Sequence, residues 1–368
     1  MTVPASHPLG LTAEQFRLAF PRIVPGGDTA VLRRYAAIFR AGDRTGLDVP
    51  VGEINRVQTS DSGEGTVVKF TQWVAGRRAD ERLETESVLI PMIGKRRIRA
   101  YTLCVSSQVG CAMGCGFCQT AQMGLVRSLQ PWEIVQQWFA ARWLVERPDR
   151  DAEIRNIVFM GMGEPMDNLD AVMQAIDVLT DQRGPAVAAC RVTVSTVGRI
   201  DGITRFAEYV NRPGNHRIGL AISLNAPNDQ VRSQIMPVNR AMPLAKLREA
   251  LLNWPFYSGK HLCLEYVLIP GVNDAMEHAD QLAAYVKGDG AEAPALTGMV
   301  NVIPYNPREG SPWPAPTEES VDAFVARLTS HGVYTKRRRT KGRDQMAACG
   351  QLGNLAYRRK PIAVTVSQ

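Results

Sequence analysis

The sequence predicts an α/β protein in which a partial (β/α) barrel core follows a small N-terminal accessory region. From about residue 97 onward, strand-like and helix-like segments alternate, as they do in parallel βαβ units. The polar and cysteine-rich motifs come directly after predicted strands, which is where the active sites of such barrels gather. With 368 residues and 45% hydrophobic content, the chain can bury a sizeable core.

The N-terminal region, residues 1–91, has a different pattern. Apolar residues recur at helical spacing within the first 45 residues, so we expect helices there. Residues 66–74 and 83–90 alternate as the two strands of a hairpin do. We therefore divide the chain into this accessory region, a core at 92–345 and a C-terminal segment at 346–368.

The core follows the alternation closely. Strands are expected at 100–105, 156–160, 191–195, 218–223, 262–269, 298–304 and 333–336. Helices are expected to begin near Pro131, Leu169, Ile203, Leu244, Met276 and Glu318. Pro131 is a favourable first-turn residue, and Glu133 is favourable near a helix N-terminus.

Charge and cysteine usage narrow the class of protein. The formal net charge is +7, and basic residues crowd at 95–99 and 336–343. Such runs are often solvated faces, but their position near cysteine-bearing segments favours a polyanionic partner.

The chain has no apolar run of about 18 residues and no secretory signal pattern, so we expect a cytoplasmic protein without a membrane segment. Its seven cysteines are an odd number, which argues against a framework of structural disulfides.

The central signal is the run Cys111-Ala-Met-Gly-Cys115-Gly-Phe-Cys118. Closely spaced thiolates separated by small residues can wrap around one metal centre. A zinc site requires four ligands, and no histidine lies nearby. Three cysteines on a four-iron cluster leave one iron open for a chelating substrate or cofactor. The alternatives are a zinc knuckle and a set of buried structural cysteines.

This spacing, with Phe117 before the last cysteine, resembles the signature of the radical SAM superfamily. Further motifs narrow the resemblance to the RlmN/Cfr family of RNA methyltransferases. They lie at 104–111, 118–124, 160–165, 194–196, 222–229, 270–274, 303–307 and 347–352. Their order in the chain is more specific than any one of them, and together they cover residues 86–352.

The resemblance implies a [4Fe-4S] cluster and S-adenosyl-L-methionine as cofactors. The cluster ligands would be Cys111, Cys115 and Cys118. The residues implied in binding S-adenosylmethionine are Gly163, Glu164, Ser195, Ser223, Leu224, Asn225 and Asn306. Asn225 stands where the family usually has histidine, and asparagine can donate and accept hydrogen bonds but cannot titrate. Taken alone, these strand-end residues would more often be caps or turn residues.

The resemblance also implies three catalytic residues. Carbon 2 of adenine is electrophilic, so it cannot attack the methyl group of S-adenosylmethionine directly, whereas a thiolate can. In the family, the cysteine matching Cys349 is methylated and carries the new carbon. The cysteine matching Cys104 forms a transient disulfide that releases the product, and Glu86 matches the proposed proton acceptor.

The predicted activity is methylation of carbon 2 of an adenosine in 23S ribosomal RNA, with transfer RNA as a second candidate substrate. Methylation of carbon 8, as in the Cfr branch, is the alternative, and a non-catalytic RNA-binding protein on the same scaffold is another. The aspartates that the family carries before Ala347 are reduced here to Asp344, next to Arg343. We expect a monomer that receives electrons from a donor such as flavodoxin or ferredoxin.

Overall fold

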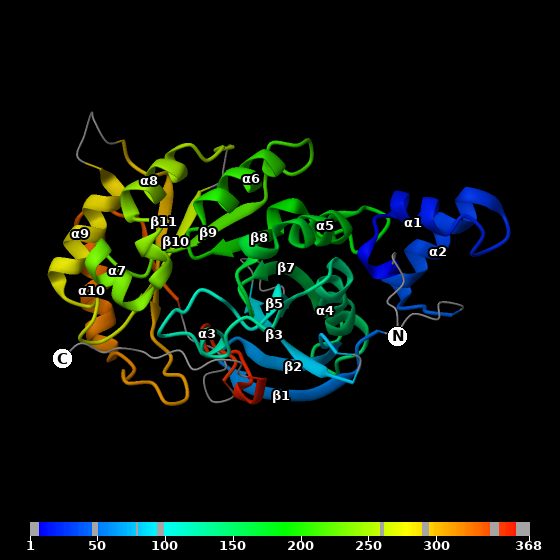
Figure 1. The fold of residues 1–368 in the computed structure, drawn as a ribbon, viewed down its shortest axis with the longest axis horizontal. Helices are drawn as coiled ribbons and strands as arrows, with labels where there is room; N and C mark the ends of the chain where they lie inside the picture. Colours follow the sequence, from blue (N-terminus) through cyan, green and yellow to red (C-terminus); the bar gives the residue numbers. More distant parts are fainter. Residues whose placement is uncertain are drawn as a thin grey trace. The chain divides into compact units, whose positions relative to one another are not determined.

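The structure, a computed structural model, describes residues 7–45, 51–78, 80–93, 99–257, 261–288, 294–338 and 346–357 (Figure 1). Two compact units alternate along the sequence. Unit 1 comprises Met1–Val109, Arg127–Met162 and Asn168–Val192. Unit 2 comprises Gly110–Val126, Gly163–Asp167 and Thr193–Gln368. Each unit is therefore assembled from separate stretches of the chain.

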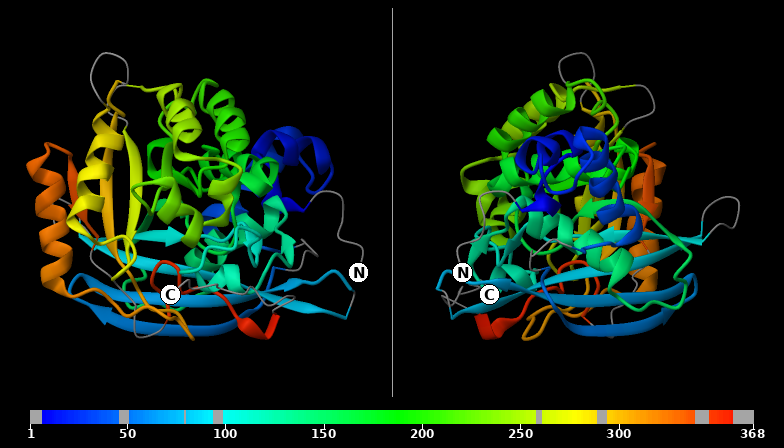
Figure 2. Two further views of the ribbon diagram at one scale, coloured as in Figure 1. Left: turned by 60° about the vertical axis from the view of Figure 1, so that its left-hand side comes forward. Right: turned by 90° about the vertical axis from the view of Figure 1, so that its right-hand side faces the viewer.

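Unit 1 is built on a mixed sheet. Strands β1 (Ile54–Ser62), β2 (Gly65–Ala75), β3 (Arg82–Ile93) and β4 (Arg99–Cys104) pair antiparallel in that order, and β7 (Glu153–Phe159) pairs parallel with β4. Figure 2 shows β1, β2 and β3 as long strands lying side by side. The expected hairpin is confirmed as β2 and β3, and β1 adds a strand at its edge.

Helices α1 (Ala13–Ala19) and α2 (Gly27–Ala41) confirm the helical prediction for the first 45 residues. Aromatic rings join them, with Phe16 and Tyr35 centroids 5.4 Å apart. The other helices of unit 1 are α4 (Pro131–Trp143) and α5 (Leu169–Thr180). Helix α4 begins at Pro131 as expected, and Glu133 in its first turn accepts from Gln130 N–H at 2.8 Å. A short hairpin, β5 (Gln108–Val109) and β6 (Arg127–Ser128), completes the unit.

Unit 2 is built on a parallel sheet. Strands β8 (Val192–Thr196), β9 (Gly219–Ser223), β10 (Leu262–Leu268), β11 (Gly298–Pro304) and β12 (Thr335–Arg337) pair with their neighbours in sequence order. Buried apolar residues of these strands, among them Val194, Ile222, Leu264, Tyr266 and Val302, form the core of the unit. Because the strands are parallel, all their carboxyl ends lie at one edge of the sheet.

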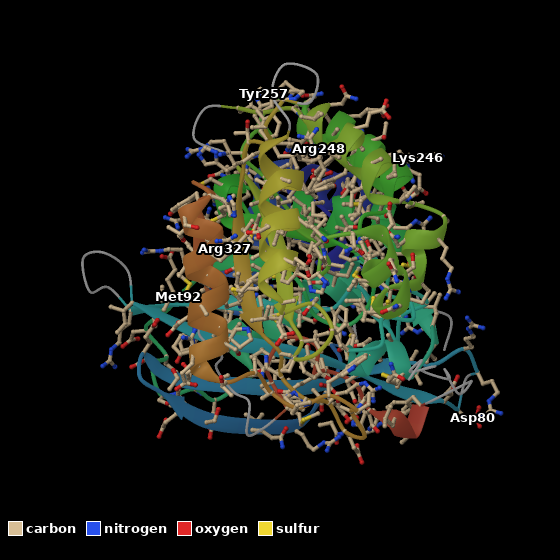
Figure 3. The ribbon with its side chains drawn as sticks, turned by 90° about the vertical axis from the view of Figure 1, so that its left-hand side faces the viewer. Asp80, Met92, Lys246, Arg248, Tyr257 and Arg327 are labelled. Atoms are coloured by element: carbon tan, nitrogen blue, oxygen red, sulfur yellow. The ribbon has the colours of Figure 1, made fainter. Side chains whose placement is uncertain are left out.

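Helices α6 (Ile200–Val210), α7 (Asp229–Ile235), α8 (Leu244–Leu252), α9 (Met276–Lys287) and α10 (Glu318–Ser330) connect these strands, and the short α3 (Gln119–Gln122) follows the cysteines. The two arginines labelled in Figure 3 join neighbouring helices. Arg248 of α8 donates to Tyr285 O at 2.9 Å, and Arg327 of α10 donates to Asp280 of α9 at 2.6 Å.

The predicted fold class is confirmed as a mixed α/β fold with a parallel sheet and antiparallel N-terminal strands. Helix α6 begins three residues earlier than expected, at Ile200, and α7 has no counterpart among the predicted helices. The division of the chain at residues 91 and 345 stays a prediction.

Candidate active site

The three clustered cysteines lie on one loop of unit 2 that begins at Gly110. Gly110 has a φ of 74°, and a Cβ there would lie 1.9 Å from the Gly124 carbonyl oxygen, so the backbone requires glycine. Gly116 is held from both sides, since its N–H donates to Ile235 O and its carbonyl accepts from Arg308 Nε, each at 2.9 Å. Hydrogen bonds from distant segments thus fix the loop that carries Cys111, Cys115 and Cys118.

Two of the three thiols on this loop are buried, and Cys118 is partly exposed. Cys111 and Cys115 are 7% and 5% exposed, and none of the three loop cysteines forms a disulfide. Burial raises the pKa of both thiols, and the neighbouring thiols raise it further. Thiolates in this environment need a positive partner, which a metal centre supplies.

The described residues contain no three His, Cys, Asp or Glu side chains that converge as the ligands of one metal ion do. A zinc ion requires such convergence. The cysteines of an iron–sulfur cluster bind separate irons, so they need not converge on one point. The loop carries three neighbouring thiols, two of them buried, and this donor set fits such a cluster.

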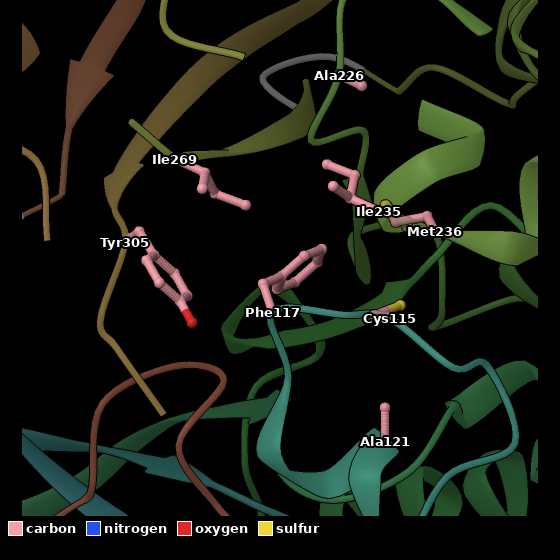
Figure 4. Packing of buried hydrophobic residues seen from close by; sticks show 8 residues of the cluster. All are labelled: Cys115, Phe117, Ala121, Ala226, Ile235, Met236, Ile269 and Tyr305. Carbon is pink, nitrogen blue, oxygen red and sulfur yellow. The ribbon is translucent and has the colours of Figure 1, made fainter. Parts of the chain in front are cut away.

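An apolar cluster lies against the cysteine loop (Figure 4). Phe117 packs with Ile235, Met236, Ile269 and Tyr305, and Cys115 belongs to the same cluster. These side chains come from the loop, the end of α7 and the carboxyl ends of β10 and β11. They keep water from the thiols, which strengthens every electrostatic interaction at that point.

Glu164 lies in the short segment of unit 2 that starts at Gly163. Its carboxylate oxygens accept from Met166 N–H at 3.1 Å and from Val197 N–H at 3.0 Å. Burial raises the pKa of Glu164 to about 7, and hydrogen bonds from Thr196, Val197 and Met166 partly oppose this shift. The carboxylate is thus fixed at the end of β8, where it can meet an ammonium group.

The other predicted cofactor residues follow the parallel strands of unit 2. Ser195 lies in β8 opposite Ala221, Ser223 ends β9 opposite Glu265, and Asn306 follows β11. Ser195 and Asn306 are buried. The structure therefore brings Ser195, Ser223, Leu224, Asn225 and Asn306 to one edge of the sheet, as the sequence predicts.

Asn225 has a structural role in addition to any role toward a ligand. Its φ is 57°, a left-handed conformation that asparagine tolerates better than most residues. Its Oδ1 accepts from Val267 N–H at 2.9 Å, and its own N–H donates to Glu265 O at 3.1 Å. The side chain thus ties the end of β9 to β10.

Sequence reasoning missed Arg232, which is fully buried in α7. Its guanidinium donates to Leu224 O at 2.9 Å, Ser223 O at 3.3 Å, Val197 O at 2.5 Å and Asn239 Oδ1 at 3.0 Å. One side chain therefore holds the ends of β8 and β9 together. Buried arginines usually have such a task, but the sequence of this seven-residue helix gives no sign of it.

Cys349 lies beside the cysteine loop within unit 2. The segment around it is pinned by Gln119 N–H, which donates to Gly350 O at 2.7 Å, and by Gln351 Nε2, which donates to Pro307 O at 3.0 Å. Burial raises the pKa of the Cys349 thiol, Arg338 opposes that shift, and Glu265 and Cys118 add to it. The structure thus joins two cysteine motifs that are far apart in the sequence.

Glu86 and Cys104 share one face of the sheet in unit 1. Val88 of β3 lies opposite Cys104 of β4, and Glu86 is two residues from Val88 on the same strand. Cys104 is buried, and Ser106 Oγ donates to the Glu86 carbonyl at 2.6 Å. Lys69 Nζ lies 2.8 Å from Glu86 Oε2, a contact that sequence reasoning missed.

The basic segments are described only in part. Arg337 pairs with Glu318 and Asp322, and Arg338 pairs with Glu265 at 3.5 Å, so these two cations serve the fold. Residues 94–98 and 339–345, which hold most of the predicted RNA-contacting cations, lie outside the described residues. None of the described helices is both long enough and apolar enough to cross a membrane.

Comparison with known proteins places these features in context. A family model described as the radical SAM superfamily matches residues 105–283. The dual-specificity RNA methyltransferase RlmN of Lawsonia intracellularis is 43% identical over 308 residues, which cover 83% of this chain and 80% of that protein. The corresponding protein of Syntrophotalea carbinolica is 41% identical over 294 residues, or 80% of this chain and 71% of that one. The crystal structure of a radical SAM methyltransferase from Sphaerobacter thermophilus has a TM-score of 0.79 and 32% identity, covering 93% of this chain and 98% of that one.

Proposed function

We propose, on the premise that the chain belongs to the RlmN family of radical SAM RNA methyltransferases, that it methylates carbon 2 of an adenosine in 23S ribosomal RNA, with transfer RNA as a second substrate. The observation that carries the proposal is the attachment of the Cys349 segment to the cysteine loop. A methyl-carrying thiol must lie near the source of the radical, and hydrogen bonds from Gln119 and Gln351 hold it there.

The residues present fit the two cofactors of this chemistry. Cys111, Cys115 and Cys118 would hold the [4Fe-4S] cluster, whose open iron would take S-adenosylmethionine. Glu164 and the strand-end residues Ser195, Ser223, Leu224, Asn225 and Asn306 would bind that cofactor, with Gly163 leaving room for it. The cofactors together supply a methyl group and a hydrogen-abstracting radical.

Cys349 acts first as a nucleophile in this scheme. Its thiolate would attack the methyl carbon of S-adenosylmethionine. The Cys349 sulfur would become a thioether as the methyl–sulfonium bond breaks and S-adenosylhomocysteine leaves with the bonding electrons. After the carbon has joined the adenine ring, the Cys104 thiolate attacks the Cys349 sulfur. A disulfide forms as the sulfur–carbon bond breaks, and the carbon leaves with the bonding electrons and takes up a proton to become methyl.

Glu86 removes the proton from the ring carbon that receives the methyl group. The Glu86 carboxylate, which lies 2.8 Å from Lys69 Nζ, can accept this proton. Its place on the same face as Cys104 supports the assignment, because both groups act at the stage when protein and RNA are joined.

The surroundings of the reaction are part of the proposal. The enzyme is cytoplasmic and monomeric, and a small electron carrier such as flavodoxin or ferredoxin reduces its cluster. Its net charge of +7 suits a phosphate-rich substrate.

The deciding experiment compares RNA from cells with and without the gene. The RNA is digested to nucleosides and analysed by mass spectrometry against standards of 2-methyladenosine and 8-methyladenosine. We expect 2-methyladenosine to disappear when the gene is deleted. If 8-methyladenosine disappears instead, the methylated position is carbon 8 and not carbon 2. If neither nucleoside changes, the protein is a non-catalytic RNA-binding protein.

A further inference from the structure

We infer that Lys69 is the positioning residue of the Glu86 base: its ammonium holds the carboxylate on the face of the sheet that carries Cys104. The inference rests on the role proposed for Glu86 and adds a residue that no sequence motif indicated. It starts from an ion pair inside unit 1, in which Lys69 Nζ lies 2.8 Å from Glu86 Oε2.

The pair is buried on both sides. The Lys69 and Glu86 side chains are 9% and 5% exposed, and the neighbours of Lys69 in β2, Val68 and Phe70, are fully buried. Lysine is almost never buried unless it is paired, because the desolvation of an ammonium is costly. A lysine in the middle of this strand therefore serves its partner.

The register of the sheet places the pair next to Cys104. Lys69 of β2 lies opposite Val88 of β3, and Val88 lies opposite Cys104 of β4. Glu86 is two residues from Val88, so its side chain emerges on the same face, and the ion pair runs diagonally from β2 to β3. Base, cation and resolving thiol thus share one face of three adjacent strands.

A second carboxylate on this face provides an internal comparison. Glu84 accepts from Thr71 Oγ1 at 3.2 Å and from Arg56 Nη2 at 3.2 Å, and Asn55 also donates to it. Glu86 Oε2, in contrast, has no donor with hydrogen-bonding geometry among the described residues, although the Lys69 charge lies 2.8 Å away. Glu84 is held by several hydrogen bonds, while Oε2 of Glu86 keeps lone pairs that can take a proton.

The chemical step is a proton transfer. The ring C–H bond breaks, the proton goes to the Glu86 carboxylate, and the electron pair stays in the adenine ring. Once the acid gives up this proton, the carboxylate pairs with the Lys69 ammonium again. Without Lys69, the carboxylate loses the partner that fixes its position.

The test follows the covalent protein–RNA adduct in a single turnover of the loaded enzyme, on a denaturing gel. Lys69→Met should form the adduct at the normal rate and resolve it at least about tenfold more slowly, within the range that a general base contributes. Lys69→Arg, which keeps the charge, should restore most of the rate. Arg56→Met, which removes a partner of Glu84 on the same face, is the matched control and should resolve the adduct normally.

Each outcome decides between the inference and its premise. If Glu86→Gln resolves the adduct normally, the role proposed for Glu86 fails. If Glu86→Gln stalls and Lys69→Met does not, or if Arg56→Met stalls equally, only the inference about Lys69 fails. Should Lys69→Met not fold, Lys69→Gln takes its place. If neither Lys69→Met nor Lys69→Gln folds while Glu86→Gln does fold, Lys69 is a purely structural residue.

Discussion

Replacing Arg232 with methionine tests how unit 2 holds its strand ends. The guanidinium has four described acceptors, three of them main-chain carbonyls at the ends of β8 and β9. A buried acceptor left without a donor costs about 1–3 kcal/mol. The variant also no longer has to bury the positive charge of Arg232, and the avoided desolvation cost offsets several kcal/mol of that loss. We therefore expect Arg232→Met to lower the free energy of unfolding by about 3 kcal/mol.

The matched control is Arg327→Met, the same substitution at a surface ion pair. Arg327 pairs with Asp280 at 2.6 Å, but its side chain is 47% exposed, so water screens the pair. Its loss should cost less than about 1 kcal/mol. Urea titration followed by tryptophan fluorescence measures both variants. Equal losses, or a loss below about 1 kcal/mol for Arg232→Met, would refute the reasoning.

Three other predictions concern the site. Changing any of the cluster cysteines, Cys111, Cys115 or Cys118, to alanine should remove iron and sulfide from the reconstituted protein. A triple variant that keeps about four irons per chain would show that these cysteines do not bind the cluster. Cys349→Ala should keep the cluster and lose all methyl transfer, whereas Cys104→Ala should accumulate RNA attached through Cys349; normal turnover by either variant would remove that residue from the scheme. Burial raises the pKa of Glu164 to about 7 from the usual 4.5, so the folded chain holds a proton that the unfolded chain releases. Its contribution to stability is therefore full below about pH 4.5 and falls as the pH rises to about 7, by at most about 1.4 kcal/mol per unit. The stability of Glu164→Gln should lack this component, which urea titrations across that pH range would detect.

The strands of the core were predictable because their apolar runs are bounded by turn residues. The expected strand at 298–304 coincides with β11, and the helix expected at Pro131 begins there. Helix α7 was not predicted because its seven residues are too few to show a helical period of apolar residues. The role of Arg232, which lies in this helix, was therefore not predicted either. Helix α6 begins at Ile200, three residues before the expected start, and Arg199, which precedes it, pairs with Asp167 and Asp201.

Site residues that belong to sequence motifs could be predicted. Contacts that depend on the register between strands could not. The cysteine spacing and the strand-end polar residues identify the cofactor-binding edge of unit 2. The pairing of Lys69 with Glu86 depends on which residues of β2 and β3 face each other, and a predicted hairpin leaves that open. The basic run at 336–343 shows the same limit, because ion pairs within the fold engage Arg337 and Arg338.

The anchoring of the cysteine loop has a consequence for synthesis of the protein. Arg308 and the Gly116 carbonyl that it holds are 192 residues apart, and Thr120 bonds to Leu352 O, 232 residues further along the chain. The ribosome releases the three cysteines long before it makes these anchors. Contacts of such high sequence separation form late in folding. The loop therefore reaches its final shape only when nearly the whole chain has emerged, and the nascent thiols must remain reduced until then.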